Sequence, residues 1–68
     1  MAGSGKDTSD AASGVYFELT PIGASVKVVA IDAATGTEVS VIAPVHAAQA
    51  DLRRLALRKL RARLKADT

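Results

Sequence analysis

Residues 25–43 read SVKVVAIDAATGTEVSVIA and carry the clearest hairpin signal in the chain. Ser25–Asp32 is rich in β-branched residues, which favour strands, and Thr37–Ala43 alternates between apolar and polar side chains. The residues between these segments read DAATG, in which Asp32 can accept hydrogen bonds from the turn and Gly36 follows four residues later. This pattern predicts a β-hairpin with a type I turn and a left-handed glycine bulge.

A further strand is predicted before the hairpin. Val15–Thr20 reads VYFELT and has the period-two alternation of a half-buried strand. Residues 21–24 read PIGA and indicate a turn, because proline cannot donate to a strand ladder and glycine permits positive φ. The short connections favour an antiparallel meander.

The apolar period becomes helical after Pro44. Small and leucine side chains recur three or four residues apart and form one stripe: Ala48, Leu52, Leu55, Ala56, Leu60 and Leu64. We expect this stripe to cover the sheet face that carries Phe17, Leu19, Val26, Val28, Val39 and Val41. The predicted fold is therefore an α+β domain over residues 15–66: a three-stranded antiparallel β-meander followed by one C-terminal amphipathic basic helix packed on one sheet face (βββα).

The first fourteen residues, MAGSGKDTSDAASG, have no apolar run. This composition predicts a disordered N-terminal tail over residues 1–14. It also lacks the apolar stretch of roughly 7–15 residues that a secretory signal needs, and no stretch approaches the ~18 apolar residues of a transmembrane helix. Together with the absence of cysteine, these features predict a cytoplasmic location and no membrane partner.

Charge is strongly segregated along the chain. Residues 46–68 carry seven cations and two carboxylates, net +5, whereas residues 1–45 carry two cations and five carboxylates, net −3. Such a split is typical of a module that offers a charged face to a partner. Four cations fall opposite the apolar stripe and are predicted to contact an acidic partner or a nucleic acid: Arg54, Arg58, Arg61 and Lys65. The chain has only two aromatic residues, Tyr16 and Phe17, which argues against stacking on bases.

One helix cannot cover both faces of a three-stranded sheet. The alternation of the strands places four apolar side chains on the other face: Tyr16, Val29, Ile31 and Ile42. Exposed apolar patches mark interfaces, and a chain of 68 residues without a disulfide gains stability by association. We therefore predict a small non-catalytic interaction module that self-associates, or joins a larger complex, through this face. The alternative is nonspecific RNA or DNA binding through the basic helix.

No pattern of catalytic or ligand-binding residues is found. His46 has no neighbouring serine or cysteine nucleophile, and the carboxylates of Glu18, Asp32 and Glu38 are explained by a turn and by solvated strand positions. We predict no catalytic residue, no metal, no cofactor and no small-molecule substrate.

The run SVKVVAIDAATGTEVSVIAP followed by QADLRRLALRKL resembles a family of short bacterial proteins classed as a domain of unknown function. The resemblance covers about residues 15–65 and rests on the hairpin and the helix. It implies a fold shared with these relatives and transfers no site residue.

The strands and helix also resemble the later half of the double-stranded RNA-binding domain, but two features differ. That domain has an additional N-terminal helix, and its lysines cluster at the start of the last helix. Here the start of the helix carries His46, Gln49 and Asp51 instead.

Overall fold

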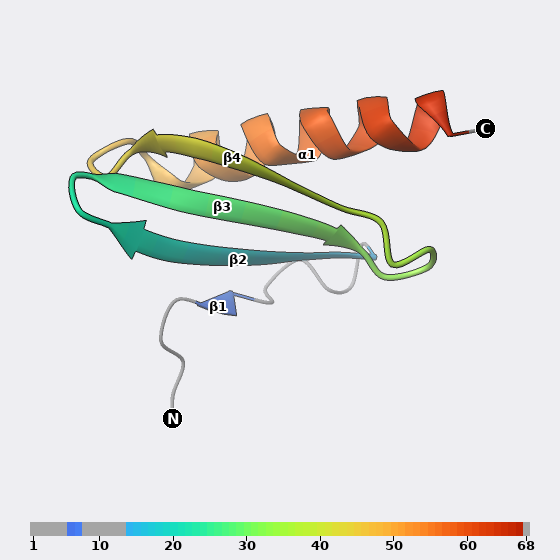
Figure 1. The fold of residues 1–68 in the computed structure, drawn as a ribbon, viewed down its shortest axis with the longest axis horizontal. Helices are drawn as coiled ribbons and strands as arrows, with labels where there is room; N and C mark the ends of the chain where they lie inside the picture. The colour runs from blue at the N-terminus through green and yellow to red at the C-terminus, as the bar shows by residue number, and fades with distance from the viewer. Residues whose placement is uncertain (1–5, 8–13, 68) are drawn as a thin grey trace.

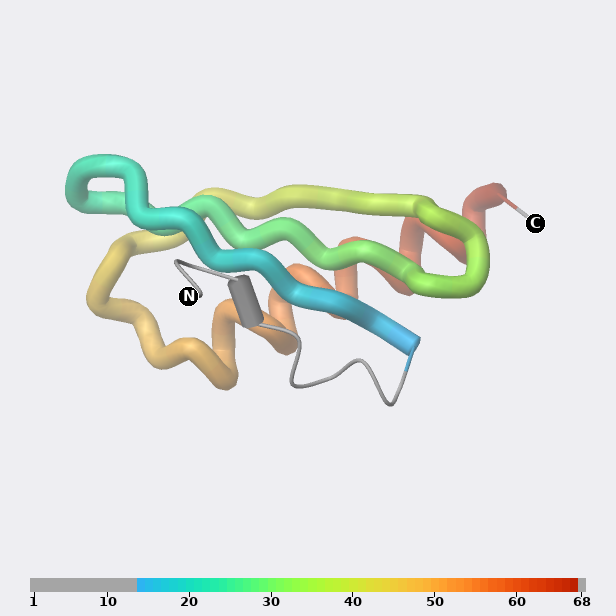
Figure 2. Tube along the Cα trace, turned by 90° about the horizontal axis from the view of Figure 1, so that it is seen from below, coloured from blue at the N-terminus to red at the C-terminus, as the bar shows by residue number. Residues whose placement is uncertain are grey.

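The computed structural model describes residues 6–7 and 14–67 and has two layers, a sheet and a helix. The strands are β1 (Lys6–Asp7), β2 (Val15–Ile22), β3 (Ser25–Asp32) and β4 (Glu38–Pro44), and the helix α1 is Gln49–Ala66. The strands form one antiparallel sheet in the order β1-β2-β3-β4, and α1 lies against one face of it (Figure 1; Figure 2). The predicted meander followed by one packed helix is confirmed.

Strand β1 is not predicted by the sequence analysis. Its two residues, Lys6 and Asp7, pair with Glu18 and Phe17 at the outer side of β2. They fall within the predicted disordered tail, and the rest of that prediction, over residues 1–5 and 8–13, lies outside the described residues.

The first turn is tighter than the sequence suggests. Strand β2 continues through Pro21 to Ile22, which pairs with Ser25, so only Gly23 and Ala24 remain in the turn. Gly23 has a φ of 60°, and positive φ at the first of two turn residues is the feature of a type II′ hairpin. Proline is tolerated in β2 because β1 pairs only with Phe17 and Glu18, which leaves Pro21 at an open edge.

The second turn has the predicted chemistry. Gly36 has a φ of 76°, and its amide donates to the Asp32 carbonyl over 2.8 Å. The Asp32 carboxylate accepts from the Thr35 amide at 3.0 Å and from the Thr35 hydroxyl at 2.8 Å. The left-handed glycine and the turn-forming aspartate are therefore both confirmed.

The core lies between α1 and strands β2 to β4. Its buried side chains are Val15, Phe17, Leu19, Val26, Val28, Ala30, Val39, Leu52, Ala56 and Leu60. Leu60 and Val28 are the largest of the fully buried side chains. The expectation that Leu55 belongs to this core is wrong, since it keeps 43% of its surface, whereas Leu57 and Leu64 pack at the margin of the core.

The helix begins without a side-chain cap and carries charges that suit its dipole. Ala48 occupies the N-cap position and has no side chain that can accept a hydrogen bond from the first turn. Asp51 lies in the first turn, and Arg63 and Lys65 lie in the last. Within the part of the chain that the structure describes, no helix has the length and apolarity needed to cross a membrane.

Candidate protein–protein interface

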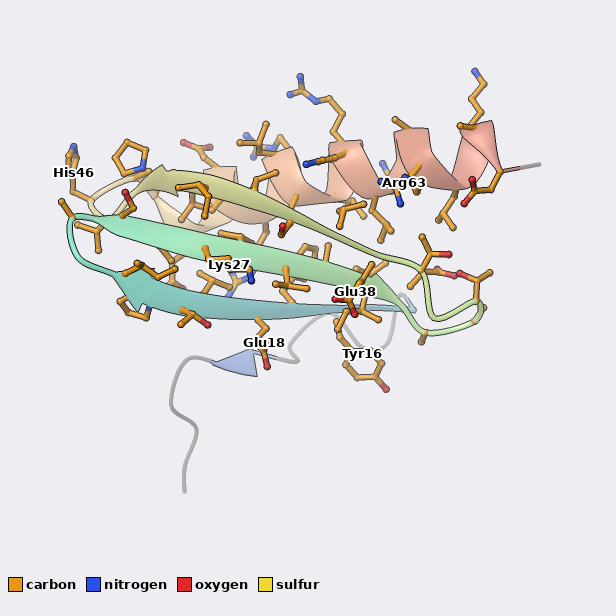
Figure 3. All side chains as sticks on the ribbon, in the orientation of Figure 1. Tyr16, Glu18, Lys27, Glu38, His46 and Arg63 are labelled. Carbon is orange, nitrogen blue, oxygen red and sulfur yellow. The ribbon has the colours of Figure 1, made fainter. Side chains whose placement is uncertain are left out.

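The sheet has an outer face, which is the face turned away from α1. Side chains alternate along each strand, so the pairing among β2, β3 and β4 assigns twelve residues of these strands to this face: Tyr16, Glu18, Thr20, Ile22, Ser25, Lys27, Val29, Ile31, Glu38, Ser40, Ile42 and Pro44. Figure 3 shows labelled members of this set, among them Tyr16, Glu18 and Lys27, on the sheet away from the helix. Among the described elements, only α1 packs on the sheet, and it covers the opposite face.

The four predicted interface residues share the outer face, but they are not equally accessible. Ile42 keeps 61% of its surface and Tyr16 keeps 40%, whereas Ile31 is half-buried. Val29 is only 9% exposed, which corrects its place in the predicted patch. It lies at the centre of the middle strand, opposite Glu18 and Ser40, and neighbours on both sides cover it. Val29 therefore forms the floor of the face rather than a contact point.

Ile22 is an exposed residue of the outer face that the sequence analysis assigns to a turn. It keeps 52% of its surface and lies at the same end of the sheet as Ile42. Ile22 follows the same alternation as Tyr16. The sequence analysis misses it because the predicted strand ends before Pro21. We call Tyr16, Ile22, Ile31 and Ile42 the outer-face patch.

Three charges surround the outer-face patch and are separated along the strands. Glu18 and Glu38 are acidic, and Lys27 is the only cation among the twelve residues of the face. Lys27 lies opposite Ile42, whereas Glu38 lies opposite Ile31 towards the other end of β3. The face therefore has a basic position at one end and an acidic position at the other.

The helix presents a second, basic surface. The four predicted contact residues, Arg54, Arg58, Arg61 and Lys65, are all exposed on α1. Arg54 forms an ion pair with Asp51 at 3.1 Å, and both side chains are well exposed, so the pair contributes little to stability. Asp51 is the only carboxylate within α1, against seven cations, so this surface is strongly positive.

The family model described as "Domain of unknown function (DUF6898)" matches residues 12–67, which include β2, β3, β4 and α1. The chain belongs to the DUF6898 family. The resemblance to a domain of unknown function, stated from the hairpin and helix residues, is thereby confirmed. Comparisons with curated proteins and with solved structures give no match.

In this DUF6898 chain, the match covers both surfaces but excludes β1. All members of the outer-face patch and all four cations of the basic surface lie within residues 12–67, whereas Lys6 and Asp7 precede them. Both surfaces are therefore parts of the region that defines the family.

His46 lies apart from both surfaces. It is exposed in the connection between β4 and α1, at one end of the molecule (Figure 3). In the described ranges, 6–7 and 14–67, no group of three or more His, Cys, Asp or Glu side chains is placed to hold a metal ion.

Proposed function

We propose that this DUF6898 chain is a small non-catalytic interaction module that self-associates through the outer face of its sheet. The observation that supports this proposal is the outer-face patch, where Tyr16, Ile22 and Ile42 each keep 40% or more of their surface. A domain of this size buries only roughly 60% of its unfolded surface, so covering this patch adds stability that the monomer lacks.

A second copy of the chain is the proposed occupant because a two-fold axis pairs Lys27 of each copy with Glu38 of the other, although it also lays Glu18 on Glu18. The two outer faces pack against each other, with a two-fold axis between them that runs across the strands. Strand β3 of one copy then lies on β3 of the other in the opposite direction, and Lys27 of one copy lies near Ile31 of the other. Ile31 is the cross-strand neighbour of Glu38, so each Lys27 then faces a carboxylate of the other copy. Such rim charges contribute little affinity, but they fix orientation.

The area of the outer face limits the affinity expected between two copies of the chain. Three strands of seven or eight residues span roughly 25 by 14 Å at about 3.3 Å per residue and about 4.8 Å between strands. Each face then covers about 350 Å², and pairing two such faces covers roughly 700 Å² in total, which is below the ~1,200–2,000 Å² of stable specific interfaces. We therefore expect a weak dimer with a Kd in the micromolar range, in a cytoplasmic setting.

Sedimentation velocity over a concentration series tests this proposal. Tyr16→Lys and Ile42→Lys should each shift the equilibrium towards monomer, because each places a charge in the outer-face patch. Leu55→Lys is the matched control, since Leu55 is a similarly exposed apolar residue that lies on the helix. A wild-type chain that stays monomeric at hundreds of micromolar, or equal effects of all three substitutions, would exclude association through this face.

Binding of an anionic polymer by the basic surface is the second candidate. It is supported by the four exposed cations on α1, with Asp51 as the only carboxylate in the helix. Phosphate contacts would supply the affinity, and counterion release would make it steeply dependent on salt.

A further inference from the structure

Strand β4 forms an edge of the sheet, and its outward backbone positions can be assigned. The Asp32 amide donates to the Thr37 carbonyl at 2.8 Å, and the Val45 amide donates to the Ala24 carbonyl at 3.0 Å. Backbone groups alternate in direction along an antiparallel strand, so odd-numbered residues here face β3 and even-numbered residues face away from it. Glu38, Ser40 and Ile42 therefore turn their backbone amides and carbonyls towards the open edge.

The backbone carbonyl of the middle residue, Ser40, accepts a hydrogen bond from a side chain of the helix. The Lys59 Nζ donates to the Ser40 carbonyl oxygen over 2.7 Å, which joins residues 19 positions apart in the chain. The donor is charged, and hydrogen bonds from charged donors are the stronger class. Lys59 thus binds the outward-facing Ser40 carbonyl, which a strand added at this edge would use as a hydrogen-bond acceptor.

Apolar side chains flank this edge on both sides of the sheet. Ile42 is 61% exposed on the outer face. Leu55 is 43% exposed and lies one helical turn before Lys59, on the same flank of α1. Ala62 continues this flank with a small, exposed side chain that leaves room for a second helix. A strand added to β4 would therefore cover apolar surface as well as satisfy backbone groups.

We propose that Lys59 closes the β4 edge against antiparallel pairing with a second copy of this chain. The pairing that it prevents is centred on Ser40, with Glu38 of each copy opposite Ile42 of the other. A second copy fits because a two-fold axis through Ser40 makes the three outward positions of one strand meet the three outward positions of the other. The same axis brings both helices to one side of the joined sheet, with Leu55 and Ala62 of each copy along the seam. This surface shares only Ile42 with the outer-face patch, and the proposal does not depend on the proposed function.

The test replaces Lys59 in a Tyr16→Lys background, in which outer-face association is suppressed. Tyr16 lies on β2, two strands away from β4, so this substitution is remote from the β4 edge. Lys59→Met keeps the aliphatic stem but removes the donor, whereas Lys59→Arg keeps a charged donor and serves as the matched control. Lys59→Ala is a second variant without a donor. Lys59 is exposed, so all three variants are expected to fold, which circular dichroism checks.

Lys59→Met and Lys59→Ala should raise the self-association constant by about tenfold or more in sedimentation equilibrium, and Lys59→Arg should leave it within about twofold. Residue-resolved amide exchange should slow at Ser40 and Ile42 as the concentration of Lys59→Met rises, because these amides enter the new ladder. An unchanged association constant would overturn the proposal. So would stronger association without protection at Ser40 and Ile42, because the new contact would then lie elsewhere.

Discussion

Leu55 and Leu60 lie five residues apart on α1, yet Leu60 is fully buried and Leu55 keeps 43% of its surface. Five residues correspond to about 140° around a helix of 3.6 residues per turn, so the two side chains leave the axis in different directions. Leu60 joins the core with Val28, and Leu55 lies on the flank that also carries Lys59.

Truncation of these two leucines should therefore give different results. Leu60→Ala should lower the free energy of unfolding by about 2–5 kcal/mol, because it loses buried area and leaves a cavity. Leu55→Ala makes the same chemical change at an exposed site and should cost less than about 1 kcal/mol. Urea denaturation followed by circular dichroism measures both. Equal losses would show that the helix is rotated relative to the packing described here.

The hairpin between β3 and β4 should be sensitive to the handedness of residue 36. A Cβ atom at Gly36 would meet no other atom within 4 Å, so the cost of Gly36→Ala is the positive φ of 76° alone. We expect a loss of about 1–2 kcal/mol. The chain is short enough for chemical synthesis, and D-alanine at the same position suits positive φ and should be neutral or stabilising. Equal destabilisation by both enantiomers would contradict this account of the turn.

The charges of the outer face can be tested by exchange. Lys27→Glu and Glu38→Lys should each weaken self-association by roughly two- to tenfold, because each places like charges across the proposed two-fold axis. The combined variant restores opposite charges and should recover most of the lost affinity. Sedimentation equilibrium at low salt of the wild-type chain, the two single variants and the combined variant gives the coupling free energy between Lys27 and Glu38. Independent, additive losses would indicate that Lys27 and Glu38 do not meet across the interface.

The basic surface of α1 predicts a salt-dependent affinity for nucleic acid. Any binding to a duplex should fall steeply between low and physiological salt, and a protein in which Gln replaces Arg54, Arg58, Arg61 and Lys65 should lose it while keeping its fold. Fluorescence anisotropy with a labelled duplex measures this. Nanomolar affinity at physiological salt that depends on these four residues would make nucleic-acid binding the leading function.

The parts of the fold that local sequence determines were predictable. The DAATG turn specifies its own geometry through Asp32 and Gly36, and the change of apolar period after Pro44 marks the transition from strands to helix. Strand β1 has no such signal, because two residues are too few to show a period.

The side of the helix that becomes buried was predicted, since Leu52, Ala56 and Leu60 belong to the expected stripe, but the limits of that stripe depend on tertiary placement. The position of the helix over β3 and β4 buries Leu52, Ala56 and Leu60 and leaves Leu57 and Leu64 at the margin of the core. The same placement exposes Leu55 and brings Lys59 to Ser40. In the sheet, alternation correctly places Tyr16, Ile31 and Ile42 on one side, but the predicted strand stops before Ile22, and alternation does not indicate that Val29 is nearly buried.

The most direct test of association through the outer face is an isotope-filtered NOE experiment on an equimolar mixture of labelled and unlabelled chain at high micromolar concentration. We predict contacts between copies from the Ile31 methyl groups to the Ile42 methyl groups and from the Tyr16 ring to the Ile22 methyl groups. We predict none from the buried Leu60. Contacts between copies that arise only from helix residues, or no contacts in a sample that sediments as a dimer, would contradict the central claim.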